Sequence, residues 1–134
     1  MTFIAVTDFP ILAAQLATFL FGLVMMAQLL LAAGVLPISM AWGGRQTVLT
    51  PGLRLASLAA ILFLGLFIYI IRFRAGLLGD VALPTSIRAL AWVVTGFMAL
   101  NTLGNFASRS MGERLLFGPV TLLLTAACLV VAMS

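Results

Sequence analysis

The stretch FPILAAQLATFLFGLVMMAQLLLAA, residues 9–33, decides the fold class of this chain. It contains no charged residue over its whole length. A helix rises about 1.5 Å per residue and the hydrocarbon core of a bilayer is about 30 Å thick, so about 20 apolar residues span it. The stretch therefore predicts a transmembrane helix.

Three more apolar runs of similar length follow, at residues 53–71, 87–107 and 111–133. Three short loops join the four runs, and short connections make successive helices antiparallel neighbours. We therefore predict an all-α, polytopic membrane protein. Residues 1–134 would form one transmembrane domain, an antiparallel bundle of four transmembrane helices.

The composition supports the same class of protein. The chain is 64% hydrophobic and only 7% charged, with a mean hydropathy of +1.29, whereas a soluble domain carries about 25% charged residues. The net charge of +4 comes from arginines at the ends of the apolar runs, a position typical of anchors at the lipid headgroups. The expected partner is therefore the lipid bilayer and not nucleic acid, with binding of phosphate-bearing lipid as an open alternative.

Several kinds of chemistry are excluded by what the chain lacks. It has no histidine and one cysteine, Cys128, which rules out a His-ligated haem, an intrachain disulfide and a CxxC redox pair. We expect no cofactor and no metal. Without His or Lys a nucleophile has no evident base, which argues against an enzyme. The middle thirds of the runs carry no charged residue, which argues against a proton-coupled transporter.

Helix starts are marked by polar residues near prolines. Asp8 stands two residues before a proline and Thr50 directly before another, as N-cap residues do. Before the last run, Ser110 and Glu113 have the spacing of a capping box, in which each side chain accepts from the other residue's backbone N–H. A proton- or cation-binding role for Glu113 is the alternative. Pro119, in the third turn of the last run, predicts a kink.

The last run carries one stripe of small residues, spaced three or four apart. In lipid such residues let helix backbones approach closely, and packing then drives association. We predict that the stripe is a contact face, against the bundle or against a second copy. Its members are Gly118, Thr121, Thr125, Cys128 and Ala132.

Asn101, Asn105 and Ser108 follow one another at steps of four and three, so they share a face of the third helix. An amide in hydrocarbon needs a hydrogen-bond partner, so this face should point into the bundle. It either fixes the helix packing or forms a polar site or pathway for a small solute. The candidate partners are Gln15 or Gln28 on the first helix, Ser57 on the second, and Thr121 and Thr125 on the fourth.

The distribution of arginines between the two ends of the bundle predicts how the chain is oriented in the membrane. Four arginines lie at the first and third loops and three at the opposite end. By the positive-inside rule we expect the first and third loops in the cytoplasm, with dual topology left open. In either orientation these two loops lie on one side of the membrane.

Two segments resemble a family of small bacterial four-helix integral membrane proteins. Residues 32–57 carry a Gly-Gly loop and an Arg that opens the second helix, and residues 101–120 carry Asn, Ser-x-Ser, Glu-Arg and Gly-Pro. The resemblance implies a multi-pass protein of the bacterial inner membrane and assigns no activity. The matching positions are Gly34, Gly43, Gly44, Pro51, Arg54, Asn105, Ser108, Ser110, Glu113, Gly118 and Pro119.

Two functions fit these residues. The first is a homo-oligomeric binding or permeation module for a small solute or lipid, in which the Gly-Gly loop exposes backbone N–H groups and nearby arginines attract an anionic group. The second is a non-catalytic accessory subunit, which packs against a partner membrane protein through the small-residue stripe. The candidate binding residues of the first are Trp42, Gly43, Gly44, Arg45, Arg54, Asn101, Asn105 and Ser108.

Overall fold

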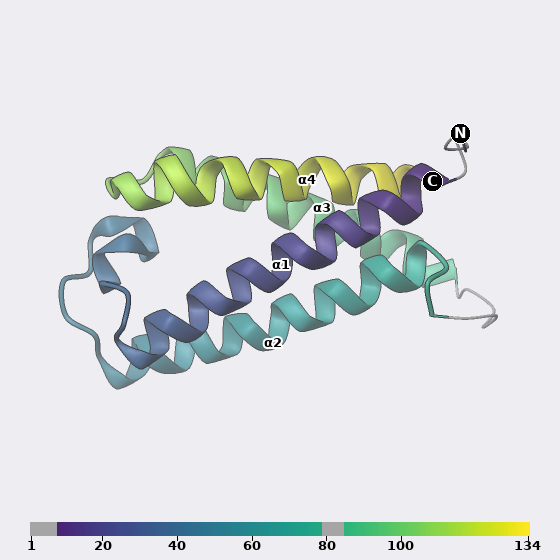
Figure 1. The fold of residues 1–134 in the computed structure, drawn as a ribbon. Helices are drawn as coiled ribbons and strands as arrows, with labels where there is room; N and C mark the ends of the chain where they lie inside the picture. The colour runs from purple at the N-terminus through teal and green to yellow at the C-terminus, as the bar shows by residue number, and fades with distance from the viewer. Residues whose placement is uncertain (1–7, 79–84) are drawn as a thin grey trace, which may run out of the picture.

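The computed structural model describes residues 8–78 and 85–134, and in this part the chain is helical with short loops (Figure 1). Helix α1 spans Phe9–Ala33, α2 spans Pro51–Arg74 and α3 spans Thr85–Phe106. The last helical stretch consists of a π-helical turn, η4 (Glu113–Phe117), continued by α4 (Gly118–Met133). All four helical stretches are long and apolar enough to cross a membrane.

The four stretches pack as an antiparallel bundle built from two hairpins. Helix α1 packs chiefly on α2 and α3 on α4, and α1 also contacts α4. Figure 1 shows the hairpins close together at the end that holds the termini and separated at the other end. The first loop, residues 34–50, lies at the separated end with two short 3₁₀ turns, η2 (Ile38–Met40) and η3 (Trp42–Gly44). The third loop, residues 107–112, lies at the same end.

Both the inside and the outside of the bundle are apolar. Phe21, Met98 and Leu124 are fully buried in one core cluster that joins the helices. Leu62 and Leu100 are 77% and 70% exposed on the outer face. An apolar exterior is what lipid, as opposed to water, allows. The chain is a multi-pass membrane protein of the all-α, four-helix class.

The structure shows a side-chain cap at one of the two predicted helix starts, Thr50, and not at the other, Asp8. Thr50 caps α2, where its Oγ1 accepts from the backbone N–H of Leu53 at 3.2 Å. Asp8 is the N-cap residue of α1, as predicted, but its backbone is helical (φ −85°, ψ −16°) and its side chain makes no capping bond to the helix, so the predicted side-chain cap is wrong. The proline in the first turn still suits the helix start, because proline supplies a preset φ.

The irregularity expected around Pro119 takes the form of a π turn. The N–H of Gly118 donates to the carbonyl of Glu113, five residues earlier, which is the hydrogen bond of a π-helix. The widened turn ends directly before Gly118 and Pro119, and such a local π adjustment lets a transmembrane helix accommodate a proline, whose missing N–H would otherwise leave an internal carbonyl unsatisfied. Helical structure therefore continues to Met133.

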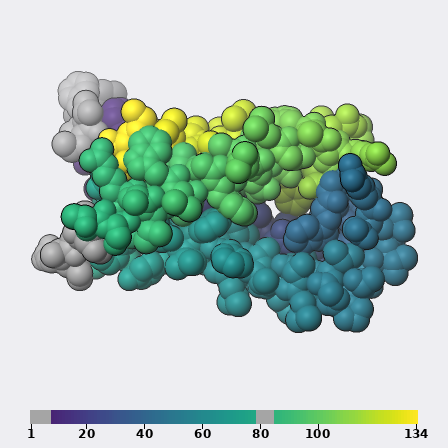
Figure 2. Space-filling view, turned by 180° about the vertical axis from the view of Figure 1, so that it is seen from behind, coloured from purple at the N-terminus to yellow at the C-terminus, as the bar shows by residue number. Residues whose placement is uncertain are grey.

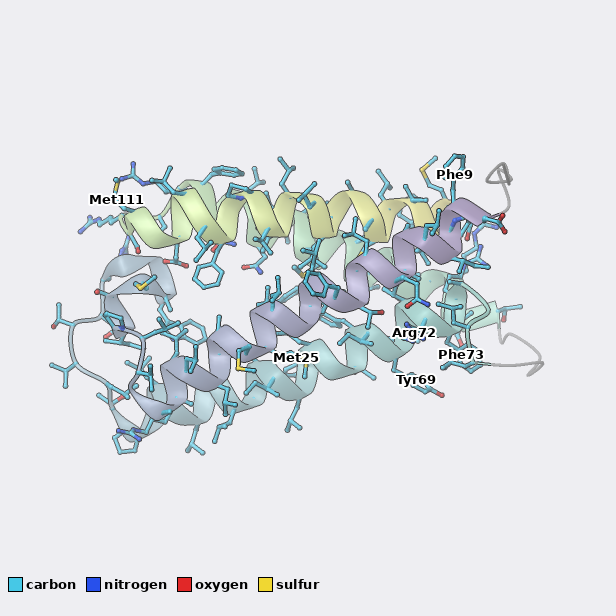
Figure 3. The ribbon with its side chains drawn as sticks, in the orientation of Figure 1. Phe9, Met25, Tyr69, Arg72, Phe73 and Met111 are labelled. Atoms are coloured by element: carbon cyan, nitrogen blue, oxygen red, sulfur yellow. The ribbon has the colours of Figure 1, made fainter. Side chains whose placement is uncertain are left out.

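At the end of the bundle that holds the termini, Arg72 links two helices. Its guanidinium donates to Oε1 of Gln15 at 2.9 Å and to Oγ1 of Thr18 at 3.2 Å. Figure 3 shows Arg72 on α2 reaching toward α1, beside Tyr69 and Phe73. Gln15 is thus engaged far from the asparagines of α3, and its prediction as their partner is wrong.

Candidate functional site

Asn105 lies inside the bundle and joins α3 to α4. Its side chain is 6% exposed, and Nδ2 donates to Oγ1 of Thr121 at 3.1 Å. The Thr121 hydroxyl in turn donates to the carbonyl of Phe117 at 2.7 Å. One turn away, the hydroxyls of Thr102 and Thr125 lie 3.1 Å apart. Asn105 therefore points inward, and of the candidate partner residues Thr121 is the one that bonds it; Thr125 bonds Thr102 instead, which lies outside the predicted polar face.

The turn before η4 forms only half of the expected capping box. Oγ of Ser110 accepts from the backbone N–H of Glu113 at 3.4 Å. The return bond is absent: the N–H of Ser110 donates to Oγ of Ser108 at 3.0 Å. The Ser108 hydroxyl donates to Oε1 of Glu113 at 2.7 Å. Ser108 thus takes the place in the box that the sequence assigned to the Glu113 carboxylate.

The Glu113 carboxylate is turned toward the first loop. Its Oε1 also accepts from the backbone N–H of Gly43 at 2.9 Å, and the N–H of Arg109 donates to the carbonyl of Gly43 at 3.2 Å. Glu113 is buried, at 9% exposure. We call this set of bonds among Gly43, Ser108, Arg109 and Glu113 the loop clasp, because it fastens the first loop to the third.

The backbone of the first loop explains why Gly43 of the clasp is followed by a second glycine, Gly44. Trp42, Gly43 and Gly44 have φ of 55°, 78° and 75°, in the left-handed region that favours glycine. A Cβ on Gly44 would lie 2.8 Å from the backbone nitrogen of Ser110. The N–H of Gly43 goes to Glu113 and that of Gly44 to the carbonyl of Ala41. The interpretation that these N–H groups are offered to a ligand is therefore wrong.

A cavity of about 520 Å³ opens between the first loop, α1, α3 and η4. Figure 2 shows it as a hollow between the green α3 and the blue first loop. Two of the candidate residues lie elsewhere: Arg54 is exposed at the start of α2, and Gly44 is packed against the third loop. Six line the cavity, namely Trp42, Gly43, Arg45, Asn101, Asn105 and Ser108.

The lining also includes residues that the binding set left out, among them Gln28, Arg109 and Glu113. Oε1 of Gln28 is buried and has no hydrogen-bond partner in the part of the chain that the structure describes. A glutamine inside an apolar helix was the available signal, because a buried amide requires a partner. Arg109 lines the cavity because the third loop packs against the first. The residues next to Arg109 in the sequence do not indicate that contact.

The charges around the cavity favour an anion. The side chains of Arg45 and Arg109 are exposed at its lining. Among the described residues, the one carboxylate of the lining is Glu113, and it already accepts two hydrogen bonds from the clasp. Among residues 8–78 and 85–134, no group of three or more His, Cys, Asp or Glu side chains could hold a metal ion. The lining can supply positive charge and amide groups to an organic ligand.

The cavity ends within the bundle. Its inner end is formed by Val24 and Thr121. Beyond them, toward the termini, the described core is filled by apolar side chains such as Phe21, Met98 and Leu124. In the described part of the chain, the lining of this cavity does not extend beyond Val24 and Thr121.

The small-residue stripe is used within the chain. Gly118, Thr121, Cys128 and Ala132 are buried in the bundle and Thr125 is half-buried. A Cβ on Gly118 would lie 2.8 Å from the ring of Phe106 on α3. The stripe therefore faces the chain's own helices and is not open to a second copy.

No protein-family model, curated protein or solved structure matches this chain. The fold and the cavity define a class: a small four-span membrane protein with a polar cavity at the end of the bundle that carries its first and third loops. The resemblance of residues 32–57 and 101–120 to bacterial four-helix membrane proteins stays a prediction.

Proposed function

We propose that this chain is a binding module of the membrane that holds a small molecule bearing an anionic group in the cavity beneath the loop clasp. One observation carries the proposal: Gln28, whose buried Oε1 has no hydrogen-bond partner among the described residues, belongs to the lining of a cavity that Arg45 and Arg109 also line. An unsatisfied buried acceptor costs about 1–3 kcal/mol. A ligand that donates a hydrogen bond to Gln28 removes this cost.

The ligand's chemistry follows from the lining. Arginine binds carboxylate and phosphate oxygens through its planar fork of N–H donors. The Gln28 oxygen needs a hydroxyl or N–H donor. The ligand therefore carries an anionic group together with a hydroxyl or amine a few atoms away.

Binding is better supported than permeation through one chain, because the cavity ends against the packed apolar core. The homo-oligomer expected from the sequence would have to use lipid-facing helix surfaces, since the small-residue stripe is occupied within the bundle. We further propose a bacterial inner membrane with the first and third loops in the cytoplasm, on the count of four arginines against three.

The test measures binding of glycerol 3-phosphate and phosphatidylglycerol to the protein purified in detergent, by native mass spectrometry and calorimetry. Both probes carry a phosphate and a hydroxyl. Arg45→Gln should weaken binding roughly tenfold to a hundredfold, because it removes a charge-assisted hydrogen bond. Arg54→Gln is the matched control, since Arg54 lies near the same end but outside the cavity. It should bind like the unmodified protein.

Two results would overturn the proposal: binding of neither probe, or equal losses in the two arginine variants. Purification with a stoichiometric foreign membrane protein, and no bound small molecule, would favour the accessory subunit instead.

A further inference from the structure

A second, apolar hollow adjoins the polar cavity. It has a volume of about 310 Å³ and lies between α1 and the fourth helical stretch, with Leu23, Ala27 and Leu30 on one side and Leu116 and Val120 on the other. We call it the lateral groove. Its polar lining is almost nil, in contrast to the cavity beside it.

The groove and the cavity share walls. Val24, Met40 and Phe117 line both. These three side chains come from α1, η2 and η4, so the two spaces meet where the hairpins separate. A molecule with a polar end and an apolar chain could place its polar end in the cavity and its apolar chain in the lateral groove.

The depth of the groove matches one leaflet of a bilayer. Leu23 lies ten residues before the end of α1 at Ala33, which corresponds to roughly 15 Å along the helix. The hydrocarbon core is about 30 Å thick, so half of it belongs to each leaflet. The groove therefore runs from the loop end of the bundle to about the middle of the membrane.

We infer that the ligand is a lipid with an anionic, hydroxyl-bearing headgroup, whose headgroup enters the cavity and one of whose acyl chains lies in the lateral groove. This inference rests on the proposed function and names its ligand class. The bilayer that surrounds the four spans supplies such a molecule directly to the groove. The charge of Arg45 and Arg109 selects anionic over zwitterionic headgroups.

The two spaces contribute differently to binding. An acyl chain leaves a bilayer as apolar as the groove, so burial there adds little hydrophobic free energy. The acyl chain instead gains close van der Waals contacts with the side chains of the groove, and these contacts add to the affinity that the cavity supplies. A side chain that fills the groove should therefore exclude the lipid and leave a soluble headgroup unaffected.

The test compares Ala27→Phe, which fills the groove, with Ala126→Phe on the exposed face of α4. The probes are phosphatidylglycerol, phosphatidylcholine and glycerol 3-phosphate, each titrated against the full chain in detergent. Ala27→Phe should weaken phosphatidylglycerol binding at least roughly tenfold and leave glycerol 3-phosphate binding unchanged. Ala126→Phe should change neither. Val120→Trp fills the same groove from the other side and should repeat the result if Ala27→Phe does not fold.

Each other outcome counts against the inference. Equal binding of phosphatidylglycerol in Ala27→Phe and Ala126→Phe would overturn it and leave the proposed function intact. Glycerol 3-phosphate binding as tightly as the lipid would identify a free phosphate compound as the ligand. Phosphatidylcholine binding as tightly as phosphatidylglycerol would refute the charge selection. Binding of none of the probes would overturn the inference and the proposed function together.

Discussion

One carboxylate joins two loops that are distant in the sequence. Glu113 accepts from Gly43, 70 residues earlier, and from Ser108. The sequence predicted the nearby Ser110–Glu113 bond because a capping box is a local pattern, and that bond is present. The bond to Gly43 could not be predicted, because it depends on how the two hairpins meet.

Replacing the clasp carboxylate should destabilise the protein. Glu113→Ala leaves the buried hydroxyl of Ser108 and the N–H of Gly43 without their acceptor, so we expect a loss of about 1–3 kcal/mol in the free energy of unfolding. Glu113→Gln keeps a side-chain oxygen and should lose less. Arg114→Ala, at the exposed neighbouring position, is the control and should stay within about 0.5 kcal/mol. Denaturant unfolding in detergent measures all three, and equal losses in Glu113→Ala and Arg114→Ala would refute the role of the clasp.

Gly43 of the clasp and its neighbour Gly44 should respond differently to replacement by alanine. Both have left-handed φ, which costs a residue with a Cβ about 1–2 kcal/mol. A Cβ on Gly43 meets open space, whereas one on Gly44 lies 2.8 Å from the Ser110 backbone. Gly44→Ala should therefore lower the melting temperature clearly more than Gly43→Ala. The reverse order in a thermal scan would contradict the close approach of the two loops.

At the scale of elements, the polar pattern of α3 indicated its buried face. In lipid every helix is apolar all round, so hydropathy does not say which face packs. The positions of Asn105 on α3 and of Ser108 just after it did indicate the packed face, because polar side chains avoid hydrocarbon. The pairing of Asn105 with Thr121 was among several candidates, and only the register of α3 on α4 selects it. The π turn in η4 has no comparable signal beyond the proline that follows it.

Replacing either partner of the Asn105–Thr121 bond should destabilise the α3–α4 contact, but replacing Thr121 should cost more. Thr121→Val leaves the buried amide of Asn105 without its partner, so we expect a loss of about 1–3 kcal/mol. Asn105→Leu leaves the Thr121 hydroxyl still donating to Phe117. Its loss should be closer to the roughly 0.6 kcal/mol typical of interhelical hydrogen bonds in membranes. Unfolding of each variant in detergent measures both losses of unfolding free energy. A larger loss for Asn105→Leu than for Thr121→Val would contradict this prediction.

For the whole molecule, four spans and their antiparallel order were predictable, because length and hydropathy decide them. The separation of the two hairpins at one end was not. It depends on the clasp and on side-chain packing between helices with similar apolar surfaces. Six of the eight candidate binding residues line the cavity that this separation creates. The place of Gln28 in the lining, with a buried Oε1 that has no partner among the described residues, also depends on how the helices pack.

The most direct test of the binding proposal is the mass of the intact protein released from its native membrane, with any bound molecule identified. We expect one small anionic, hydroxyl-bearing molecule per chain, and we expect Gln28→Leu to lose it because that variant removes the amide oxygen that accepts the ligand's hydrogen bond. Gln15→Leu is the matched control: it lies on the same helix and bonds Arg72 at the other end of the bundle. It should retain the molecule. A protein that carries no such molecule, or a Gln28→Leu variant that retains it fully, would contradict the account.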